Sequence, residues 1–296
     1  MRYCRNLLTL IIICLFTFSA KGEEEEEVKT ILEVNSFSEI ANTIDQFIEN
    51  GNDPTQTLVI LSLKNIFAPT DRAFYQQKNY LTLLRKSFKK LKPSKSHYYN
   101  ELVLSEYENT LVDKDIPKFI QNLFDQGMTV IVFSENISGN FNDIPYFESW
   151  TIDLLQKHKI NINQGKFKDQ KIVFKKSFKV LDNYPTFYNG LISANRFKRK
   201  NLYHQVISRF LFTMNYFPKN IIMVHNNEND LKTAETQIQV LYKNSQILSF
   251  LHKVPFREKE ELSPENYLNF MNQIVKKLNK VRRKTVNNEL KNPYEE

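Results

Sequence analysis

Cysteine is almost absent from this chain, and the two that occur, Cys4 and Cys14, both lie near the N-terminus. The rest of the chain can therefore form no disulfide, no thiol nucleophile and no thiolate metal site. Its stability has to come from a packed apolar core. Roughly 270 residues follow the N-terminal segment, enough for one large α/β domain or for a core domain with an inserted cap.

The first residues have the three parts of a secretory signal peptide. Arg2 and Arg5 give a positive start, and an unbroken apolar run extends from Leu7 to Phe18 before the small residues around Ala20. The run is too short to span a bilayer comfortably, although a retained N-terminal anchor is the alternative. No small residue lies beside Cys14, which excludes a lipoprotein.

We therefore predict a signal peptide over residues 1–22 and a mature chain over 23–296 that is exported, either to the periplasm or out of the cell. We expect no integral membrane segment in the mature chain. Its charge is modest, because removal of three basic residues leaves 38 basic and 33 acidic groups, a net charge of +5 instead of +8. Charges of both signs are interspersed, and the abundance of Lys, Asn, Ile, Phe and Tyr is typical of an AT-rich genome. We expect no nucleic-acid partner.

Apolar runs and helical periodicity alternate along the mature chain. Continuous apolar runs of this kind suit buried parallel strands, and helices between them suit βαβ crossovers. The pattern predicts a Rossmann-like three-layer α/β sandwich with a mainly parallel sheet. The expected strands are 57–61, 128–133 and 220–224, with short strands in 160–190, and the expected helices are 36–48, 73–91, 117–126, 149–157, 202–212, 228–241 and 265–283.

In an open parallel sheet, the functional site lies at the carboxyl ends of the strands. Three such ends can be identified from the apolar runs. The first gives Ser62-Leu63-Lys64-Asn65-Ile66, the second Ser134-Glu135-Asn136, and the third His225-Asn226-Asn227. These three segments are the candidate site.

The order of these features resembles a known family. A helix opened by Ser36-Phe37-Ser38-Glu39 precedes the first strand, a helical insert follows it, and a proline-helix-glycine-strand unit ends in Ser134. Later, Pro218-Lys219-Asn220 opens a strand that is followed by Asp230-Leu231-Lys232. The colinear series, over about residues 31 to 250, is similar to a family of uncharacterised exported bacterial proteins in the haloacid dehalogenase (HAD) superfamily.

The resemblance implies Asp-x-Asp-x-Thr after the first strand. There the first Asp is the nucleophile and the second the general acid and base, and further aspartates after the third strand complete a Mg²⁺ site. This chain has Ser62 at the nucleophile position, Lys64 at the acid/base position and Ile66 at the threonine position. His225 and Asn226 replace the later aspartate pair, and Ser134 retains the phosphate-binding hydroxyl.

The family's phosphate-binding lysine is also in doubt. Lys198 and Lys200 lie near the expected position, but the best helix register places Tyr203 there. The loss of the nucleophile, the acid/base and the metal ligands together removes the family's mechanism. We therefore expect a non-catalytic pseudo-phosphatase with no cofactor and no metal, which binds an unknown protein partner or a small anionic ligand at Ser62, Lys64, Ser134, His225 and Asn226.

The alternative is a divergent Mg²⁺-dependent phosphatase that uses other acids, such as Asp71, Glu135 or Asp230. Two or more carboxylates converging at metal-ligand distance at the strand ends would contradict the non-catalytic hypothesis. A third hypothesis, a secreted effector that acts on a host partner, predicts an exposed apolar patch on the cap.

The resemblance places a helical cap insert at about residues 72–113, which carries several aromatic side chains that suit either a ligand or the core. The basic segment Lys276–Lys284 belongs to the last predicted helix. It suits an anionic membrane surface or a nucleic acid, but more often such a helix packs on the core with a solvated basic face.

Export gives a direct prediction about the N-terminus. When the full chain is expressed in a bacterial host, we expect the exported protein to begin at about Glu23, and Edman sequencing or intact mass will show this. An exported protein that still carries Arg2 and the run from Leu7 to Phe18 would instead establish the N-terminal anchor.

Overall fold

The computed structural model describes residues 31–69, 98–174, 184–195, 202–253 and 263–281. Residues 31–296 belong to one compact unit. The predicted helix at 73–91 lies outside the described residues, as do residues 282–284 at the end of the basic segment. The rest of the predicted organisation can be compared with the structure element by element.

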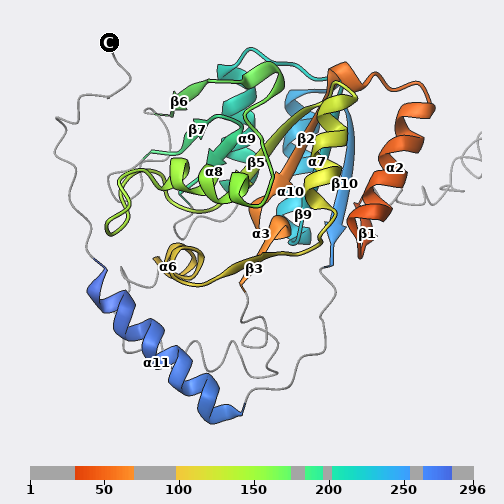
Figure 1. Cartoon of the computed structure of the whole chain (residues 1–296). Helices are drawn as coiled ribbons and strands as arrows, with labels where there is room; N and C mark the ends of the chain where they lie inside the picture. Colours follow the sequence, from red (N-terminus) through yellow and green to blue (C-terminus); the bar gives the residue numbers. More distant parts are fainter. Residues whose placement is uncertain (1–30, 70–97, 175–183, 196–201, 254–262, 282–296) are drawn as a thin grey trace, which may run out of the picture. The chain divides into compact units, whose positions relative to one another are not determined.

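An eight-stranded sheet forms the centre of the described part of the chain (Figure 1). The first six strands in spatial order run parallel, and the last two pairs in the order are antiparallel. The order is β1 (Ile31–Val34), β10 (Gln246–His252), β9 (Asn220–His225), β2 (Thr57–Ser62), β5 (Thr129–Ser134), β8 (Leu191–Ser193), β7 (Thr186–Tyr188) and β6 (Lys171–Val173).

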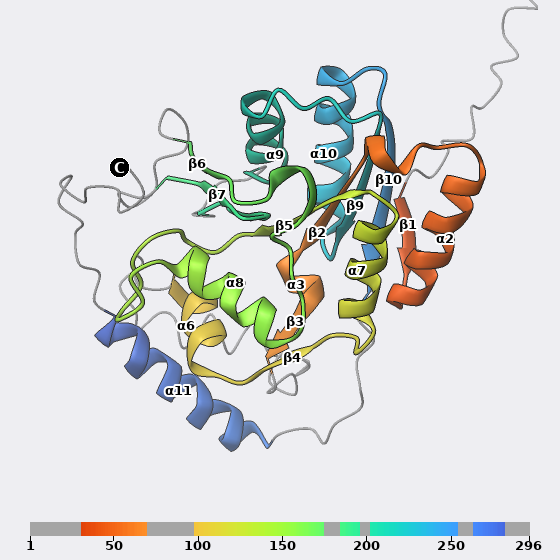
Figure 2. The same ribbon diagram turned by 45° about the horizontal axis from the view of Figure 1, so that its top comes forward.

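Helices cover both faces of this sheet (Figures 1 and 2). Alternate residues of β2 enter two separate cores: Val59 and Leu61 face one, Leu58 and Ile60 the other. The first core is covered by α2 (Phe37–Glu49), α7 (Ile116–Asp125) and α8 (Phe147–Lys157), and the second by α9 (Leu202–Thr213) and α10 (Glu228–Leu241). The predicted three-layer α/β fold with a mainly parallel sheet is confirmed.

The three apolar runs are strands buried along their whole length, as β2, β5 and β9. The helix start at Ser36 is also as expected, because the Ser36 hydroxyl accepts a hydrogen bond from the Glu39 N–H and the Glu39 carboxylate accepts one from the Asn35 N–H. In the eight-stranded sheet, β1 and β10 were not predicted, and β8 lies just past the range 160–190 in which short strands were expected. β10 pairs with β9, and β1 lies beyond it at the edge of the sheet. Their sequences interrupt the apolar pattern with Glu33, Ser249 and His252.

An antiparallel pair marks where the insert leaves the core. β3 (Phe67–Pro69) pairs with β4 (Asn109–Leu111), so the chain departs and returns at one place. Between them the structure describes residues 98–108, which contain α6 (Tyr99–Glu106). Residues 70–97, most of the predicted cap, lie outside the described residues.

The last described helix, α11 (Pro264–Lys280), packs against this insert. Phe270, Met271, Ile274 and Leu278 of α11 form one apolar cluster with residues of α6, and Lys277 forms an ion pair with Glu106 at 2.8 Å. The apolar stripe of α11 is therefore covered by protein, as the core-packed interpretation expected.

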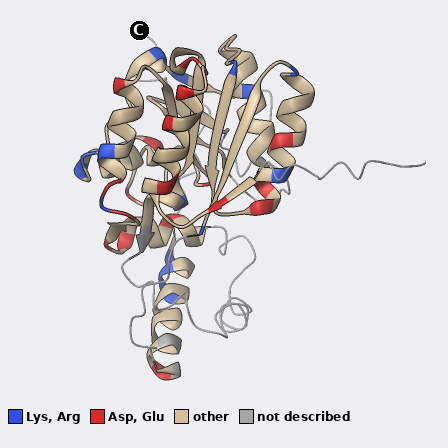
Figure 3. Cartoon of the chain, turned by 90° about the vertical axis from the view of Figure 1, so that its right-hand side faces the viewer, with Lys and Arg blue, Asp and Glu red and all other residues tan. Residues whose placement is uncertain are grey.

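The distribution of charge agrees with the expectation from the sequence. Figure 3 shows acidic and basic residues intermixed over the described elements. Within the described ranges, no helix combines the length and the apolar character that crossing a membrane requires.

The turn between β7 and β8 depends on a glycine. Gly190 has a φ of +90°, and a Cβ there would lie 2.3 Å from the carbonyl oxygen of Ile162. We expect Gly190→Ala to lower the free energy of unfolding by about 3 kcal/mol, because the clash adds to the backbone strain.

Gly51→Ala is the matched control for that measurement by urea denaturation. Gly51 has a φ of +94° but no atom within 4 Å of the added Cβ, so only the strain of about 1–2 kcal/mol applies. Equal losses in the two variants would contradict the steric argument.

Candidate functional site

Three strand ends lie side by side at one edge of the sheet, because β2 is flanked by β9 and β5. Ser62 ends β2 in register with Phe133 of β5, and the pair Leu61 and Val224 places His225 of β9 at the level of Ser62. Alternation along the strands puts Ser62 and His225 on the face that α9 and α10 cover. The segments singled out from the sequence thus meet at one place.

The chain turns sharply after Ser62 into a short helix, α3 (Leu63–Ile66). Ser62 is buried, and Ile66, at the position of the family's threonine, is part of the core. Asn65 also points inward and bonds through Nδ2 to Nδ1 of His252 at 3.0 Å. Only Lys64 of this turn reaches outward from the strand end.

Lys64 forms an ion pair with Glu135, which follows β5. The Lys64 side chain is 44% exposed, whereas that of Glu135 is 8% exposed, so the pair joins a solvated ammonium to a mostly buried carboxylate. Ser134, just before it, is buried, and its hydroxyl accepts a hydrogen bond from the Asn136 N–H at 3.1 Å. The hydroxyl of Ser134 therefore stabilises the start of the loop that follows β5.

A second carboxylate, Asp230, lies in the first turn of α10, directly after β9. Asn227 caps this helix by accepting hydrogen bonds from the N–H groups of Asn229 and Asp230. Asp230 is 7% exposed, and a carboxylate in the first turn interacts favourably with the positive end of the helix dipole. The cap thus holds Asp230 against the strand ends.

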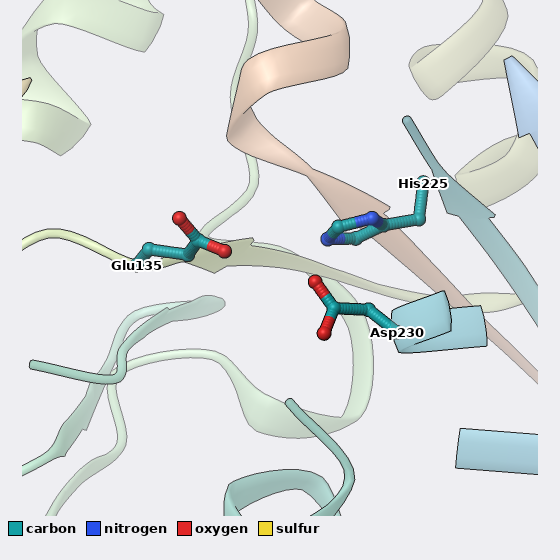
Figure 4. Close-up of side chains that lie close together, drawn as sticks. All are labelled: Glu135, His225 and Asp230. Atoms are coloured by element: carbon teal, nitrogen blue, oxygen red, sulfur yellow. The ribbon is translucent and has the colours of Figure 1, made fainter. Parts of the chain in front are cut away.

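Glu135, His225 and Asp230 converge at this edge (Figure 4). One ligand atom from each lies within 4.8 Å of the other two. Two carboxylates that face each other across such a distance repel each other, unless protons or cations lie between them. The cluster is therefore the kind of convergence that the metal-dependent alternative requires.

The imidazole of His225 is oriented by its own chain. Its Nδ1 accepts a hydrogen bond from the Asn227 N–H at 3.0 Å, so in the neutral ring the proton is on Nε2. Figure 4 shows that the other ring nitrogen faces the two carboxylates. In this tautomer the neutral ring presents an N–H to the cluster, which leaves Glu135 and Asp230 as the groups suited to a hard cation.

Tyr203 of α9 closes the cluster on the side of the helices. Its ring lies 4.8 Å from that of His225, between centroids, and the side chain is 3% exposed. Burial raises the pKa of Tyr203, and the negative charge of Asp230 raises it further. The residue that the helix register placed at the lysine position is therefore a neutral phenol beside Asp230.

The loop that carries Glu135 is held by buried oxygen atoms from three other segments. The N–H of Ile137 donates to Glu101 Oε1 at 2.9 Å, that of Ser138 to Asn195 Oδ1 at 2.6 Å, and that of Gly139 to Glu148 Oε2 at 2.6 Å. Glu101 lies on α6 of the insert and Glu148 on α8. The insert therefore contributes directly to the position of the candidate site.

Glu101 is the most unusual of these groups. It is 3% exposed, and its Oε2 has no hydrogen-bond partner within the described part of the chain. Burial raises the pKa of Glu101 to about 7, partly offset by hydrogen bonds and by the charge of Lys64. A carboxyl group next to the Lys64–Glu135 pair is thus half protonated near neutral pH.

The structure brings some of the predicted site residues together at the strand ends and leaves others apart. Ser62, Lys64, Ser134 and His225 gather at the strand ends, whereas Asn226 lies exposed on the surface. Of the alternative acids, Glu135 and Asp230 join the cluster. Asp71, Lys198 and Lys200 lie outside the described residues. Glu101 was not predicted, because nothing in its sequence context distinguishes it from a surface glutamate.

Comparison with known proteins gives a family and several relatives. The family described as "Protein of unknown function (DUF2608)" matches residues 33–283. An uncharacterized protein of Rickettsia bellii is 25% identical over 297 residues, which cover 97% of each chain. One of Rickettsia felis is 26% identical and covers 90% of this chain and 92% of its own.

Among solved structures, the chain is similar to the HAD domain of the effector protein Lem4 from Legionella pneumophila. The inactive mutant of that domain matches with a TM-score of 0.35 and 12% identity, over 76% of this chain and 96% of the other. The second structure of the domain matches with a TM-score of 0.34 and 13% identity, over 74% and 94%. The predicted membership of a family of uncharacterised bacterial proteins is confirmed.

The raised pKa of Glu101 predicts a pH-dependent stability. The unfolded carboxyl titrates near 4.5 and the folded one near 7, so stability falls as pH rises from about 4.5 to 7. Glu101→Gln keeps an acceptor for the Ile137 N–H and has no charge. We expect the variant to gain up to about 3 kcal/mol relative to the wild type between pH 5 and pH 8 in urea unfolding.

Glu106→Gln, an exposed position on the same helix, serves as the control. Any fixed cost of the buried amide appears equally at both pH values. A Glu101→Gln difference that does not change with pH would contradict the raised pKa.

Proposed function

The chain belongs to the DUF2608 family, and from that premise we propose that it is a divergent HAD-like phosphohydrolase that depends on a divalent cation. The convergence of Glu135 and Asp230, with His225, at the carboxyl ends of β5 and β9 is the observation that supports this proposal. Ser62, at the position of the family's nucleophile, ends the strand between them.

The donor set fits Mg²⁺ or a similarly hard cation. Mg²⁺ is usually held by one or two carboxylates, with water and substrate phosphate as its other ligands. Glu135 and Asp230 supply two carboxylates on neighbouring elements, and the N–H of a neutral His225 faces them without being needed as a ligand. A bound cation would screen the charge of the carboxylates and allow a phosphate group to approach.

The proposed reaction is hydrolysis of a phosphate monoester. Water forms a bond to phosphorus, the bond from phosphorus to the ester oxygen breaks, and the alcohol leaves with a proton from the water. Around that centre the chain supplies the buried hydroxyl of Ser62 and the ammonium of Lys64, which opposes the negative charge of the cluster. The phenol of Tyr203, adjacent to His225, limits the space on the side of α9.

One observation favours a second candidate function, a non-catalytic protein that binds a partner or a small anion. Lys64 already places a positive charge on Glu135, where a cation would otherwise bind. An internal ammonium of this kind reduces the demand for a metal ion. For both candidates, we propose that the protein acts after export, in the periplasm or outside the cell.

The first experiment measures hydrolysis of p-nitrophenyl phosphate by the chain from residue 23 onward, with and without millimolar Mg²⁺. We expect turnover that requires Mg²⁺, and a loss of about tenfold to a hundredfold in Asp230→Asn. Ser62→Ala tests the hydroxyl at the strand end in the same assay. Mg²⁺ should also raise the thermal stability of the wild type, since a ligand that binds the folded state stabilises it.

Asp153→Asn is the matched control, because Asp153 is an exposed aspartate of α8 on the opposite face of the sheet. It should keep both turnover and the Mg²⁺-dependent stabilisation. Absence of both effects in the wild type would contradict the hydrolase and favour the non-catalytic candidate. Turnover that survives chelation of the cation would contradict the metal dependence.

A further inference from the structure

Four large apolar side chains project from the edge of the sheet opposite the candidate site. We name Phe212, Phe217, Val240 and Leu241 the apolar tip; they are 69%, 63%, 62% and 60% exposed. They follow or end α9 and α10, whose C-terminal ends lie next to each other where β9 and β10 begin (Figure 2). Side chains of this size are rarely left so exposed in a group.

The loops that carry the apolar tip are fixed by hydrogen bonds. The hydroxyl of Ser245 donates to the Pro218 carbonyl at 2.7 Å, and the Gln246 N–H donates to the Lys219 carbonyl at 2.8 Å. Below them, the buried Tyr216 bonds through its hydroxyl to Thr129. The rings of Phe217 and Tyr242 lie 5.9 Å apart, between centroids. The exposure is therefore built into the fold.

Basic groups surround the apolar tip. The Arg209 guanidinium lies 5.8 Å from the centre of the Phe212 ring, and Lys219 and Lys243 are exposed in the two loops. Lys219 also acts on Asp53, whose pKa is lowered by hydrogen bonds from Thr55 and further by the charge of Lys219. Arg209, Lys219 and Lys243 thus place three cationic groups beside the apolar tip.

A second copy of the chain is a poor occupant for this surface. A twofold interface would bring the same patch against itself and so oppose its basic groups to one another. The apolar tip also consists of two loop-and-helix ends, whereas a stable protein interface buries about 800 Å² on each partner. An anionic lipid surface is compatible with both the basic groups and the small apolar area. It attracts the basic groups, and a few projecting apolar side chains can insert into it.

We infer that the apolar tip docks the protein on an anionic membrane surface. Phe212, Phe217, Val240 and Leu241 enter the headgroup region, while Arg209, Lys219 and Lys243 meet the lipid phosphates. Because the apolar tip and the strand ends that carry Ser62 and His225 are at opposite edges of the sheet, the docked protein presents its candidate site away from the lipid.

The test is cosedimentation with lipid vesicles. Residues 31–296 form one compact unit, so the chain is used from residue 23 onward, without the apolar run from Leu7 to Phe18 that would itself bind lipid. We expect binding to vesicles of phosphatidylcholine mixed equally with phosphatidylglycerol, and much weaker binding to phosphatidylcholine alone. Added salt should weaken the binding.

Two variants and a control separate the contributions. Phe217→Ser combined with Leu241→Ser should reduce binding by about tenfold or more, because two apolar side chains no longer enter the lipid. Lys219→Gln with Lys243→Gln should reduce binding to the anionic vesicles several-fold. Leu268→Ser, which removes an exposed leucine from α11, should leave binding unchanged.

Failure to bind anionic vesicles, or equal binding by the Phe217→Ser/Leu241→Ser variant, would overturn the inference. A dimer seen by light scattering that the same variant dissociates would assign the apolar tip to a second copy instead. None of these outcomes depends on the proposed hydrolysis, because the apolar tip shares no residue with the candidate site.

Discussion

The position of the candidate site depends on three consecutive backbone N–H groups. Those of Ile137, Ser138 and Gly139, in the loop after β5, are bound by oxygen atoms of Glu101, Asn195 and Glu148. A buried N–H without a partner costs free energy, so these contacts fix the loop in one path. That path puts Glu135 beside Lys64 and opposite Asp230. The oxygen atoms that accept these hydrogen bonds come from the insert, from the segment after β8 and from α8, so the site forms only when all three are in place.

The sheet and its burial followed from the sequence, because a parallel strand covered on both faces needs an unbroken apolar run. Thr57–Leu61 is such a run, and it became the central strand. β10 was missed because Ser249 and His252 are buried polar residues that no apolar pattern reveals. β1 was missed because it has four residues, of which Leu32 and Glu33 are exposed. The short α6 lies within the helical insert expected at about 72–113 but had no bounds of its own, since its apolar side chains face α11 and the loop after β5 instead of the main core.

The site was predictable in its location but not in its contacts. Strand ends meet at one edge of a parallel sheet, which is why Ser62 and His225 could be placed near each other from sequence alone. The pairing of Lys64 with Glu135 depends on the turn of the chain into α3, and the approach of Asp230 depends on the cap that Asn227 gives to α10. The comparison with the Asp-x-Asp-x-Thr pattern drew attention to aspartates that this chain lacks. Two carboxylates at other positions, Glu135 and Asp230, converge instead.

The packing of α11 on α6 also sets an order in time. α6 belongs to the insert and lies in the first half of the chain. The helix that packs against it, α11, begins only at Pro264. A chain that emerges from N-terminus to C-terminus completes the sheet before this helix is available. The ring centroids of Tyr107 and Phe270 are 5.3 Å apart in the folded protein. This contact can form only when synthesis of the chain has passed Phe270. The insert that holds the Glu135 loop through Glu101 thus gains its contacts with α11 only after the strands of the sheet have been synthesised.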